Sequence, residues 1–230
     1  WHRDYESDHT RGYSTNLMTA EAVRFIENSR PDDPFFLYLA YNAVHTPFQA
    51  EPEDEAAMED AYRDAPVYGR EDLVGVDDVE YIEHRVARGV PRNEAERHVH
   101  VGPEKAGGHG VTFFGMTKCM DDGIGRVLAT LERKGLRENT LVLFFSDNGG
   151  MWNNYPLRGQ KGTTREGGVR VAATMRWPGV IPAGTTSDAV VSYVDILPTF
   201  ARVAGLESAS PKQLDGTDVL DVLTGGAPET

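Results

Sequence analysis

Four side chains with useful chemistry follow or precede apolar runs of this 230-residue chain. Asp147 and Asn148 come directly after the run "LVLFFS", and two glycines follow them. His45 lies in the loop after the run "PFFLYLAYN", and Lys161 lies in a basic, glycine-rich loop before a third apolar run. A carboxylate, an amide, an imidazole and an ammonium group can together hold a cation, hold an anion and move a proton.

The Asp147–Asn148 pair offers hard oxygen donors of the kind that Ca²⁺ or Mg²⁺ prefers. Gly149 and Gly150 would let the backbone turn sharply beside such an ion. The alternative is a polar turn in which Asp147 caps the next segment. Two ligands are far fewer than the roughly six to eight that calcium takes, so the pair alone does not make a calcium site.

His45 and Lys161 each have a functional and a structural interpretation. The imidazole of His45, in a loop that Pro47 stiffens, could point into the same crevice as Asp147, or it could serve as a hydrogen-bonding structural residue. Lys161 could hold an anion as a point charge, or it could belong to a solvated basic turn with Arg165 and Glu166 in ion pairs. A P-loop is excluded, because the required order of glycines, lysine and serine or threonine is absent.

The elements that must position these residues alternate along the chain and predict an α/β layered domain. Ligands of such sheets collect beyond the carboxyl ends of the strands, so we expect the three loops to gather at one mouth of the sheet. The predicted elements are a helix over 20–29 capped by Thr19, buried strands over 34–42, 139–146 and 167–177, a helix over 111–134 ended by Gly135, and a helix over 194–206 ended by Gly205.

Residues 51–110 break this alternation. The stretch is charged and contains four prolines, and its first part, "EPEDEAAMEDAYRD", is strongly acidic. We interpret it as a surface excursion near the site rather than a separate domain. Its histidines could contribute to a leaving-group pocket or could be surface residues; they are His84, His98, His100 and His109.

Composition excludes several classes of function. The net charge of −13 argues against nucleic acid as a partner. No apolar run is long enough to span a bilayer, and the polar N-terminus lacks the apolar centre of a targeting signal, so we expect no membrane partner. Residues 158–176 are nevertheless basic enough to attract an anionic ligand. Cys119 lies on the apolar stripe of the helix predicted over 111–134 and is expected to be an unreactive core residue.

Five ordered blocks resemble the later portion of type I sulfatases, in the alkaline phosphatase superfamily. They are "PFFLYLAYNAVHTPFQA", "MDDGIGRVLATLERKGLRENTLVLFFSDNGG", "YPLRGQKGTTREGGVRVAATMRWPG", "VVSYVDILPTFARVAGL" and "LDGTDVLDVL". The segment "NYPLRGQKGTTREGGVR" is most similar to the arylsulfatase B-like branch. The resemblance implies an alkaline-phosphatase-like sandwich with a largely parallel central sheet flanked by helices. It also implies that 1–230 is part of a catalytic domain, incomplete at its N-terminus, in a periplasmic, secreted or lysosome-like location.

The same resemblance assigns roles to residues. Asp147 and Asn148 would complete a calcium site, His45 would contact a sulfate ester near its leaving oxygen, and Lys161 would grip a sulfate oxygen. The implied activity is hydrolysis of sulfate monoesters, among them those of sulfated carbohydrates.

The chain also departs from the family. Formylglycine, the family's nucleophile, is made in a Cys/Ser-x-Pro/Ala-x-Arg motif, and residues 1–230 contain no such motif. We therefore expect the chain alone to be inactive and to associate with a missing N-terminal part. Two alternatives stay open. One is a phosphonate monoester hydrolase or phosphodiesterase of the same superfamily, and the other is an inactive, truncated protein that binds sulfated glycans.

Overall fold

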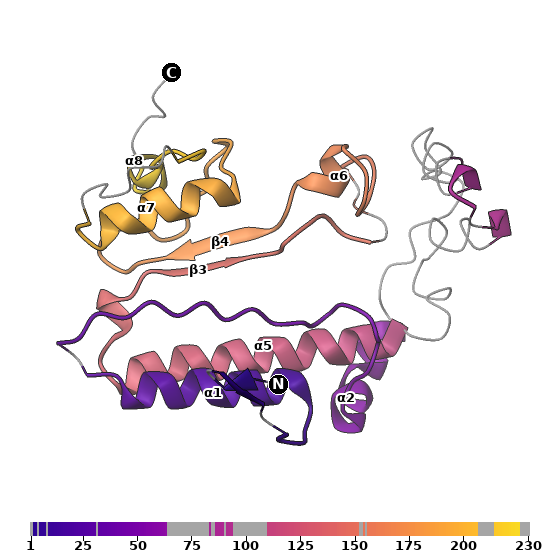
Figure 1. Ribbon diagram of the computed structural model, residues 1–230, viewed down its shortest axis with the longest axis horizontal. Helices are drawn as coiled ribbons and strands as arrows, with labels where there is room; N and C mark the ends of the chain where they lie inside the picture. The colour runs from indigo at the N-terminus through magenta and orange to yellow at the C-terminus, as the bar shows by residue number, and fades with distance from the viewer. Residues whose placement is uncertain are drawn as a thin grey trace. The chain divides into compact units, whose positions relative to one another are not determined.

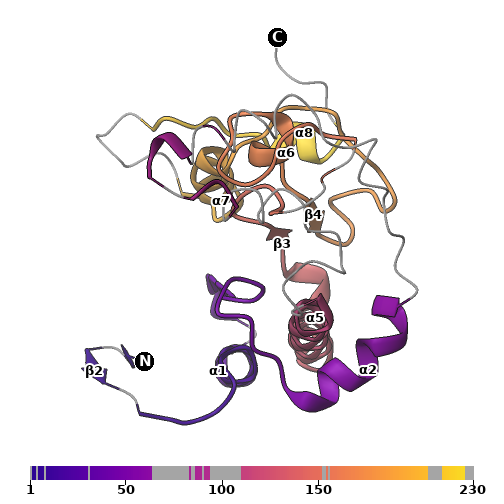
Figure 2. The same cartoon turned by 90° about the vertical axis from the view of Figure 1, so that its right-hand side faces the viewer.

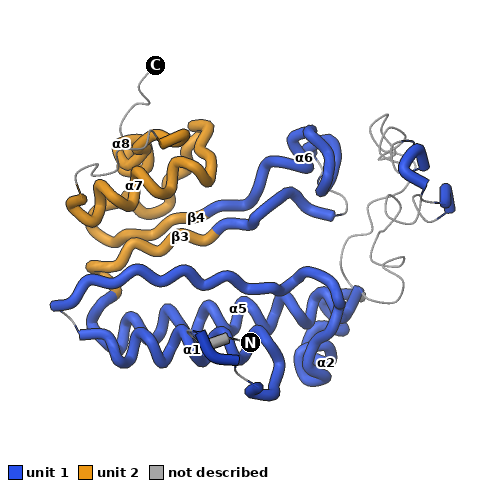
Figure 3. The backbone as a smooth tube through the Cα atoms, viewed as in Figure 1, with its two compact units in different colours: residues 1–136, 145–173 blue, residues 137–144, 174–230 orange. Residues whose placement is uncertain are grey.

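The structure is a computed structural model. It describes residues 2–3, 5–7, 9–30, 32–63, 83, 86–89, 91–93, 110–151, 154, 156–206 and 214–225. The four histidines of the predicted excursion lie outside this part of the chain. The backbone divides into two compact units, residues 1–136 with 145–173 and residues 137–144 with 174–230 (Figure 3).

The longest helices among the described residues of the first unit are α1 (Ser14–Asn28), α2 (Pro52–Arg63) and α5 (Gly110–Arg133). Helix α5 packs against both others, and α1 lies alongside it (Figures 1 and 2). The long helix predicted from the sequence is thereby confirmed. Gly135 ends it with a φ of 69°, and the Leu136 amide then donates to the Leu131 carbonyl at 2.8 Å. A short hairpin, β1 (His2–Arg3) with β2 (Glu6–Ser7), precedes α1.

Helix α1 begins earlier than predicted, and Thr19 is not its cap. Thr19 is fully buried inside the helix, where its hydroxyl donates to the Thr15 carbonyl at 2.8 Å. Threonine can bond the carbonyl one turn back, which is why its presence alone does not mark a helix start. The Tyr41 hydroxyl lies 2.7 Å from Thr19 Oγ1. Gly123 of α5 leaves room for this pair, because a Cβ there would lie 2.5 Å from Thr19 Oγ1.

The start of the predicted excursion forms a helix, Pro52–Arg63, that the sequence pattern did not predict. Its residues 52–62 are half-buried or exposed, so this helix lies on the surface. Pro52 opens α2, and three acidic residues occupy its first turn, which suits the positive end of a helix. Lys118 of α5 donates to Asp54 at 3.3 Å and so ties the two helices together. Lys118 also donates to Asp122 at 2.5 Å, and the hydrogen bonds to Asp122 and Asp54 raise the pKa of Lys118.

The run 34–42 is extended, but within the described residues it joins no sheet, so the prediction of a strand buried on both faces is wrong there. Alternate residues from Phe35 to Tyr41 are half-buried, and the Phe35 ring meets Phe25 of α1 edge-on. The opposite side is open, since Phe36 and Tyr38 are 71% and 74% exposed. The run lies alongside α1 and α5 (Figure 1) and leads to the loop that carries His45.

The core of the first unit is small and lies between its helices. Cys119 is 4% exposed, and its sulfur lies 3.6 Å from Asn16 Oδ1. Burial raises the pKa of this thiol to about 11, which confirms an unreactive core cysteine. The other buried apolar residues of this unit are Ala22, Ile26, Met116, Leu131 and Leu136. None of the helices in the described part has the length and apolarity needed to cross a bilayer.

Strands β3 (Val142–Phe145) and β4 (Ala173–Arg176) pair in a two-stranded sheet. They confirm a strand within each of the ranges predicted over 139–146 and 167–177. The prediction that these strands are buried is wrong here, because every residue of β3 and β4 is half-buried or exposed. A helical turn, α6 (Glu166–Val169), occupies the start of the second range, so the lysine-bearing loop does not run directly into the strand. Beyond the strands, the Ser146 amide donates to the Ala172 carbonyl and the Gly149 amide to the Gly168 carbonyl. In this pairing the segment after β3 and the segment before β4 run antiparallel.

The described residues of the second unit also form four helical elements. A turn, η2 (Arg137–Asn139), precedes β3. The helix predicted over 194–206 is present as the turn η3 (Tyr193–Asp195) followed by α7 (Ile196–Val203), and Gly205 follows with a φ of 68°. Helix α8 (Leu220–Leu223) contacts α7.

Candidate functional site

Two loops carry three of the four predicted site residues. The acidic loop, residues 146–151, contains Asp147 and Asn148, and the lysine loop, residues 156–168, contains Lys161. Backbone hydrogen bonds join them, because the Lys161 amide donates to the Gly150 carbonyl at 2.8 Å and the Gly149 amide to the Gly168 carbonyl at 3.0 Å. The structure thus brings together two loops that are separate along the chain.

Glycines allow the loops to approach so closely. A Cβ at Gly149 would lie 2.0 Å from the Gly167 carbonyl oxygen, and one at Gly167 would lie 2.1 Å from the Gly159 carbonyl oxygen. Neither Gly149 nor Gly150 has a positive φ. Close packing, rather than a left-handed turn, is therefore the reason for glycine here: Gly149 packs against the Gly167 backbone and Gly150 against the Asn154 side chain.

The two charged side chains of the predicted site, Asp147 and Lys161, remain available for a ligand. The Asp147 side chain is exposed and Asn148 is half-buried, with the Ser146 hydroxyl donating to the Asn148 carbonyl at 3.0 Å. Among the described residues no backbone amide bonds to the Asp147 carboxylate, so the capping alternative finds no support there. The half-buried Lys161 ammonium likewise makes no hydrogen bond or ion pair within the described ranges. Glu166 pairs instead with Arg170 at 3.9 Å.

His45 lies in an exposed loop whose geometry selects one tautomer. Its Nδ1 is 2.9 Å from the Thr46 carbonyl oxygen. A carbonyl can only accept, so Nδ1 carries the proton and Nε2 is left for another partner. His45 lines a cavity of about 190 Å³ together with Tyr13, Asn42 and Met116. No hydrogen bond or ion pair between described residues joins His45 to the acidic or lysine loop, so its place beside them stays a prediction.

The acidic loop fits a hard cation in kind but not in number. Asp147 and Asn148 supply two oxygen donors, whereas calcium takes roughly six to eight. Within the described residues no three His, Cys, Asp or Glu side chains are grouped so that they could hold a metal ion. The loop can therefore contribute to a cation site, and the remaining ligands must come from elsewhere.

Asn154, which the sequence did not single out, touches both loops. Its side-chain nitrogen lies within hydrogen-bonding distance of three backbone carbonyls, those of Gly150 at 3.0 Å, Gly159 at 3.1 Å and Gly167 at 3.0 Å. It lies between the acidic and lysine loops along the chain and touches both. An amide residue between two glycine-rich loops was the available signal, although nothing in the sequence points to three carbonyl partners.

Comparison with known proteins identifies the family of this chain. The family model described as Sulfatase matches residues 1–206. The chain is 31% identical over 224 residues to steryl-sulfatase of Rattus norvegicus, covering 92% of this chain and 30% of that protein. It is 30% identical over 218 residues to arylsulfatase J of Mus musculus, covering 93% of this chain and 29% of that protein. It thus spans less than a third of the length of these two relatives.

Solved structures agree on the fold. The structure of Ps i-CgsB in complex with k-i-k-neocarrahexaose matches with a TM-score of 0.68 and 32% identity, over 94% of this chain and 39% of that one. The structure of BT4656 in complex with its substrate D-glucosamine-2-N,6-O-disulfate matches with a TM-score of 0.72 and 22% identity, over 96% and 54%. The fold is therefore that of an alkaline-phosphatase-like α/β domain, present in part. The chain belongs to the sulfatase family.

Proposed function

We propose that this chain supplies part of the active site of an enzyme that hydrolyses sulfate monoesters. The observation that carries the proposal is the joining of the acidic and lysine loops, in which the Lys161 amide bonds the Gly150 carbonyl at 2.8 Å. This bond holds the backbone of Lys161 next to Gly150, and Asp147 and Asn148, the proposed cation ligands, lie three and two residues before Gly150. Membership of the sulfatase family supports the same reaction.

Lys161 and His45 have complementary tasks in this reaction. A sulfate monoester is an anion, and further negative charge develops on the leaving oxygen as the S–O bond breaks. Lys161 neutralises a sulfuryl oxygen. His45, whose Nδ1 is engaged by the Thr46 carbonyl, donates a proton from Nε2 to the departing alcohol when its ring is protonated. Groups of this kind are each worth about 2–4 kcal/mol at the transition state.

Asp147 and Asn148 hold one side of a Ca²⁺ or Mg²⁺ site. A bound divalent ion supplies charge neutralisation at the sulfuryl group. The other cation ligands and the formylglycine nucleophile come from outside these 230 residues, since the motif that yields formylglycine is absent from them. The N-terminal part of the same domain is the partner that we propose for this role.

We further propose a sulfated carbohydrate as the substrate. At 32% identity, the Ps i-CgsB structure contains k-i-k-neocarrahexaose, which is an oligosaccharide. The basic side chains of residues 158–176 would favour such an anionic chain over a neutral one.

A first experiment tests whether the chain is only part of a site. The 230-residue chain, loaded with Ca²⁺, is incubated with a nitrophenyl sulfate and the release of nitrophenol is followed. We expect no turnover, because the chain supplies no nucleophile. Turnover would show that these residues form a complete active site and would overturn the proposed division.

A second experiment tests the anion site itself. A sulfated oligosaccharide is titrated against the wild-type chain, Lys161→Ala and the matched control Lys134→Ala. The Lys134 ammonium donates to the Glu27 carbonyl at 2.9 Å, far along the sequence from the lysine loop. We expect weaker binding in the Lys161 variant alone. Equal affinity in all three proteins would remove Lys161 from the site.

A further inference from the structure

We propose that Asn154 is the positioning residue of this site. Its side-chain amide fastens the acidic loop to the lysine loop and thereby sets Lys161 relative to Asp147 and Asn148. The inference rests on the proposed function for the chemistry that is positioned, whereas the fastening itself rests on hydrogen bonds that the structure shows.

The contacts of Asn154 span both loops. Its Nδ2 is 3.0 Å from the Gly150 carbonyl oxygen of the acidic loop. The same nitrogen is 3.1 Å from the Gly159 carbonyl oxygen and 3.0 Å from the Gly167 carbonyl oxygen, both in the lysine loop. A primary amide has two hydrogens for these three acceptors, so at least one hydrogen is shared.

The Gly150 carbonyl takes part in both the Asn154 contact and the backbone contact with Lys161. Its carbonyl oxygen accepts both from Asn154 Nδ2 at 3.0 Å and from the Lys161 amide at 2.8 Å. A Cβ at position 150 would lie 2.1 Å from Asn154 Oδ1. Glycine at position 150 and asparagine at position 154 are therefore matched, since any side chain at 150 displaces the amide.

Only a donor can occupy this place. The Gly150, Gly159 and Gly167 carbonyl oxygens converge on Asn154 Nδ2. The bonds to Gly159 and Gly167 are partly buried, where a carbonyl needs a donor, whereas the bond to Gly150 is exposed and that carbonyl also accepts from the Lys161 amide. Removing the donor leaves carbonyl oxygens facing one another, which weakens the contact between the loops. A shift of about 1 Å in a charged group is enough to reduce its effect on a reacting anion strongly, so a change at position 154 should act through Lys161.

The test uses the 230-residue chain with Asn154→Asp, Asn154→Ala and the control Asn28→Asp. The aspartate variant keeps the size of the side chain and replaces the donor with acceptors. Asn28 Nδ2 donates to a single exposed carbonyl, that of Arg24 at 2.9 Å, so the control makes the same chemical change elsewhere. Amide hydrogen exchange of Gly149 and Lys161 is measured by NMR, and the amides of α1 and α5 report whether each variant folds.

We expect exchange at Gly149 and Lys161 to accelerate about tenfold or more in both Asn154 variants and to stay unchanged in the control, which corresponds to about 1.4 kcal/mol of lost local stability. The alanine variant keeps the test decisive if the aspartate variant fails to fold. Unchanged protection of Lys161 in the folded alanine variant would overturn the proposal.

The pH dependence of Asn154→Asp separates donation from simple packing. Once protonated, the carboxyl group can donate again, so we expect protection of Lys161 to recover partly in acid. If Asn154 acted only by packing, the loss of Lys161 protection in Asn154→Asp relative to wild type would be the same at every pH. That result would contradict the proposal.

Titration with inorganic sulfate distinguishes this inference from the proposed function. We expect sulfate to shift the Lys161 signal of the wild-type chain and to bind several-fold more weakly to Asn154→Ala. If sulfate leaves wild-type Lys161 unchanged while exchange responds to position 154, the loops are fastened as proposed but the sulfate site is wrong. If sulfate binds equally to wild type and Asn154→Ala, the positioning role is wrong and the sulfate site stands.

Discussion

Two regions of the molecule are held together by different kinds of hydrogen bond. One is the pair of acidic and lysine loops, and the other is the C-terminal segment that lies on α7. In the first unit the joint consists of glycine backbone and one neutral amide, that of Asn154. In the second unit charged side chains hold residues 214–224, a set of contacts that we call the C-terminal clamp. Each region shows how a loop is held where little apolar surface is available.

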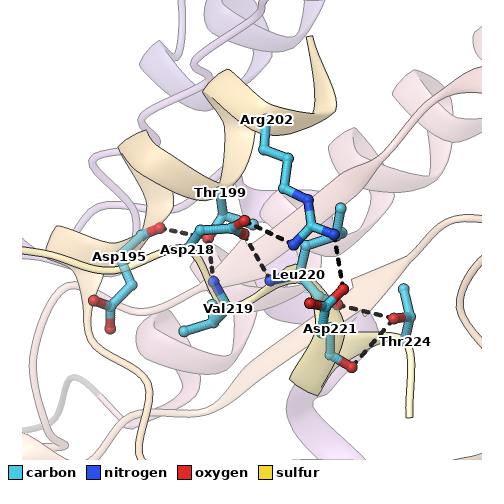
Figure 4. A network of polar contacts seen from close by, with 8 residues as sticks. All are labelled: Asp195, Thr199, Arg202, Asp218, Val219, Leu220, Asp221 and Thr224. Carbon is cyan, nitrogen blue, oxygen red and sulfur yellow. Dashed lines mark hydrogen bonds and ion pairs between the residues drawn. The ribbon is translucent and has the colours of Figure 1, made fainter. Parts of the chain in front are cut away.

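The C-terminal clamp has a buried half around Asp195 and an exposed half around Arg202. Figure 4 shows Arg202 pointing to Asp218 and Asp221. In the buried half, the Asp195 carboxylate accepts from the Ser192 amide at 2.8 Å and the Thr217 amide at 2.9 Å. In the exposed half, Arg202 donates to Asp218 and to Asp221, both at 2.8 Å. Asp221 and Asp218 raise the pKa of Arg202 through these bonds, and Arg202 lowers the pKa of Asp221.

The difference predicts different sensitivities. Hydrogen bonds between neutral groups respond little to salt or to pH, whereas exposed ion pairs are screened by salt and disappear when a carboxylate is protonated. The loops that carry the candidate site use the neutral kind. We therefore expect the geometry of this joint to respond little to a charged ligand.

The largest effect should come from the buried half of the clamp. Asp195→Ala removes a carboxylate that satisfies two backbone amides, and we expect a loss of about 3 kcal/mol in local stability. Hydrogen exchange at Thr217 and Val219 measures it. Asp188→Ala, at an exposed position, is the control and should change nothing. Unaltered exchange at Thr217 in the Asp195 variant would show that the clamp does not depend on this carboxylate.

A smaller effect should come from filling the glycine contact between the loops. In Gly149→Ala the new methyl group would lie 2.0 Å from the Gly167 carbonyl oxygen, so the two loops must separate. We expect a loss of about 2 kcal/mol, measured by exchange at Gly167 and Lys161. Gly125→Ala in α5 is matched, because no heavy atom lies within 4 Å of its new Cβ. Equal behaviour of the two variants would mean that close packing is not what joins the loops.

The smallest effect should come from acid and salt acting on the exposed half of the clamp. Since Arg202 lowers the pKa of Asp221 below its ordinary 3.8, the ion pair contributes stability above that pH and loses it as pH falls through the lowered value. Exchange at Leu220 should therefore speed up in strong acid and in high salt, relative to exchange at Gly149 and Lys161. Parallel responses in both regions would contradict the contrast drawn between them.

Periodic patterns and terminator glycines predicted several elements well. The apolar repeat and Gly135 located α5, and the run before Asp147 located β3. Helix α2 was missed although Pro52 and the acids after it are good helix-start signals, because the acidic composition of the stretch hid its one apolar face against α5. The start of α1 was misplaced because a buried threonine inside a helix has the same identity as a cap.

The candidate site was predictable in its residue types but not in its fastening. Asp147, Asn148, Lys161 and His45 stand out because charged or polar groups interrupt apolar or glycine-rich chain. Asn154 does not, because its partners are backbone carbonyls 4, 5 and 13 residues away whose convergence exists only in the fold. The run 34–42 has the composition of a doubly buried strand, yet the described residues cover only one of its sides.

The central claim, that His45 lies at the same mouth as Asn148 and Lys161, is tested most directly by paramagnetic relaxation. A nitroxide label is attached to the new cysteine of His45→Cys. Cys119, which is buried, is replaced by serine so that position 45 carries the one thiol of the chain. If the claim holds, the label broadens the Asn148 and Lys161 amide signals strongly relative to a diamagnetic label. Equal signal intensities with the two labels would place His45 away from both loops and contradict the proposed active site.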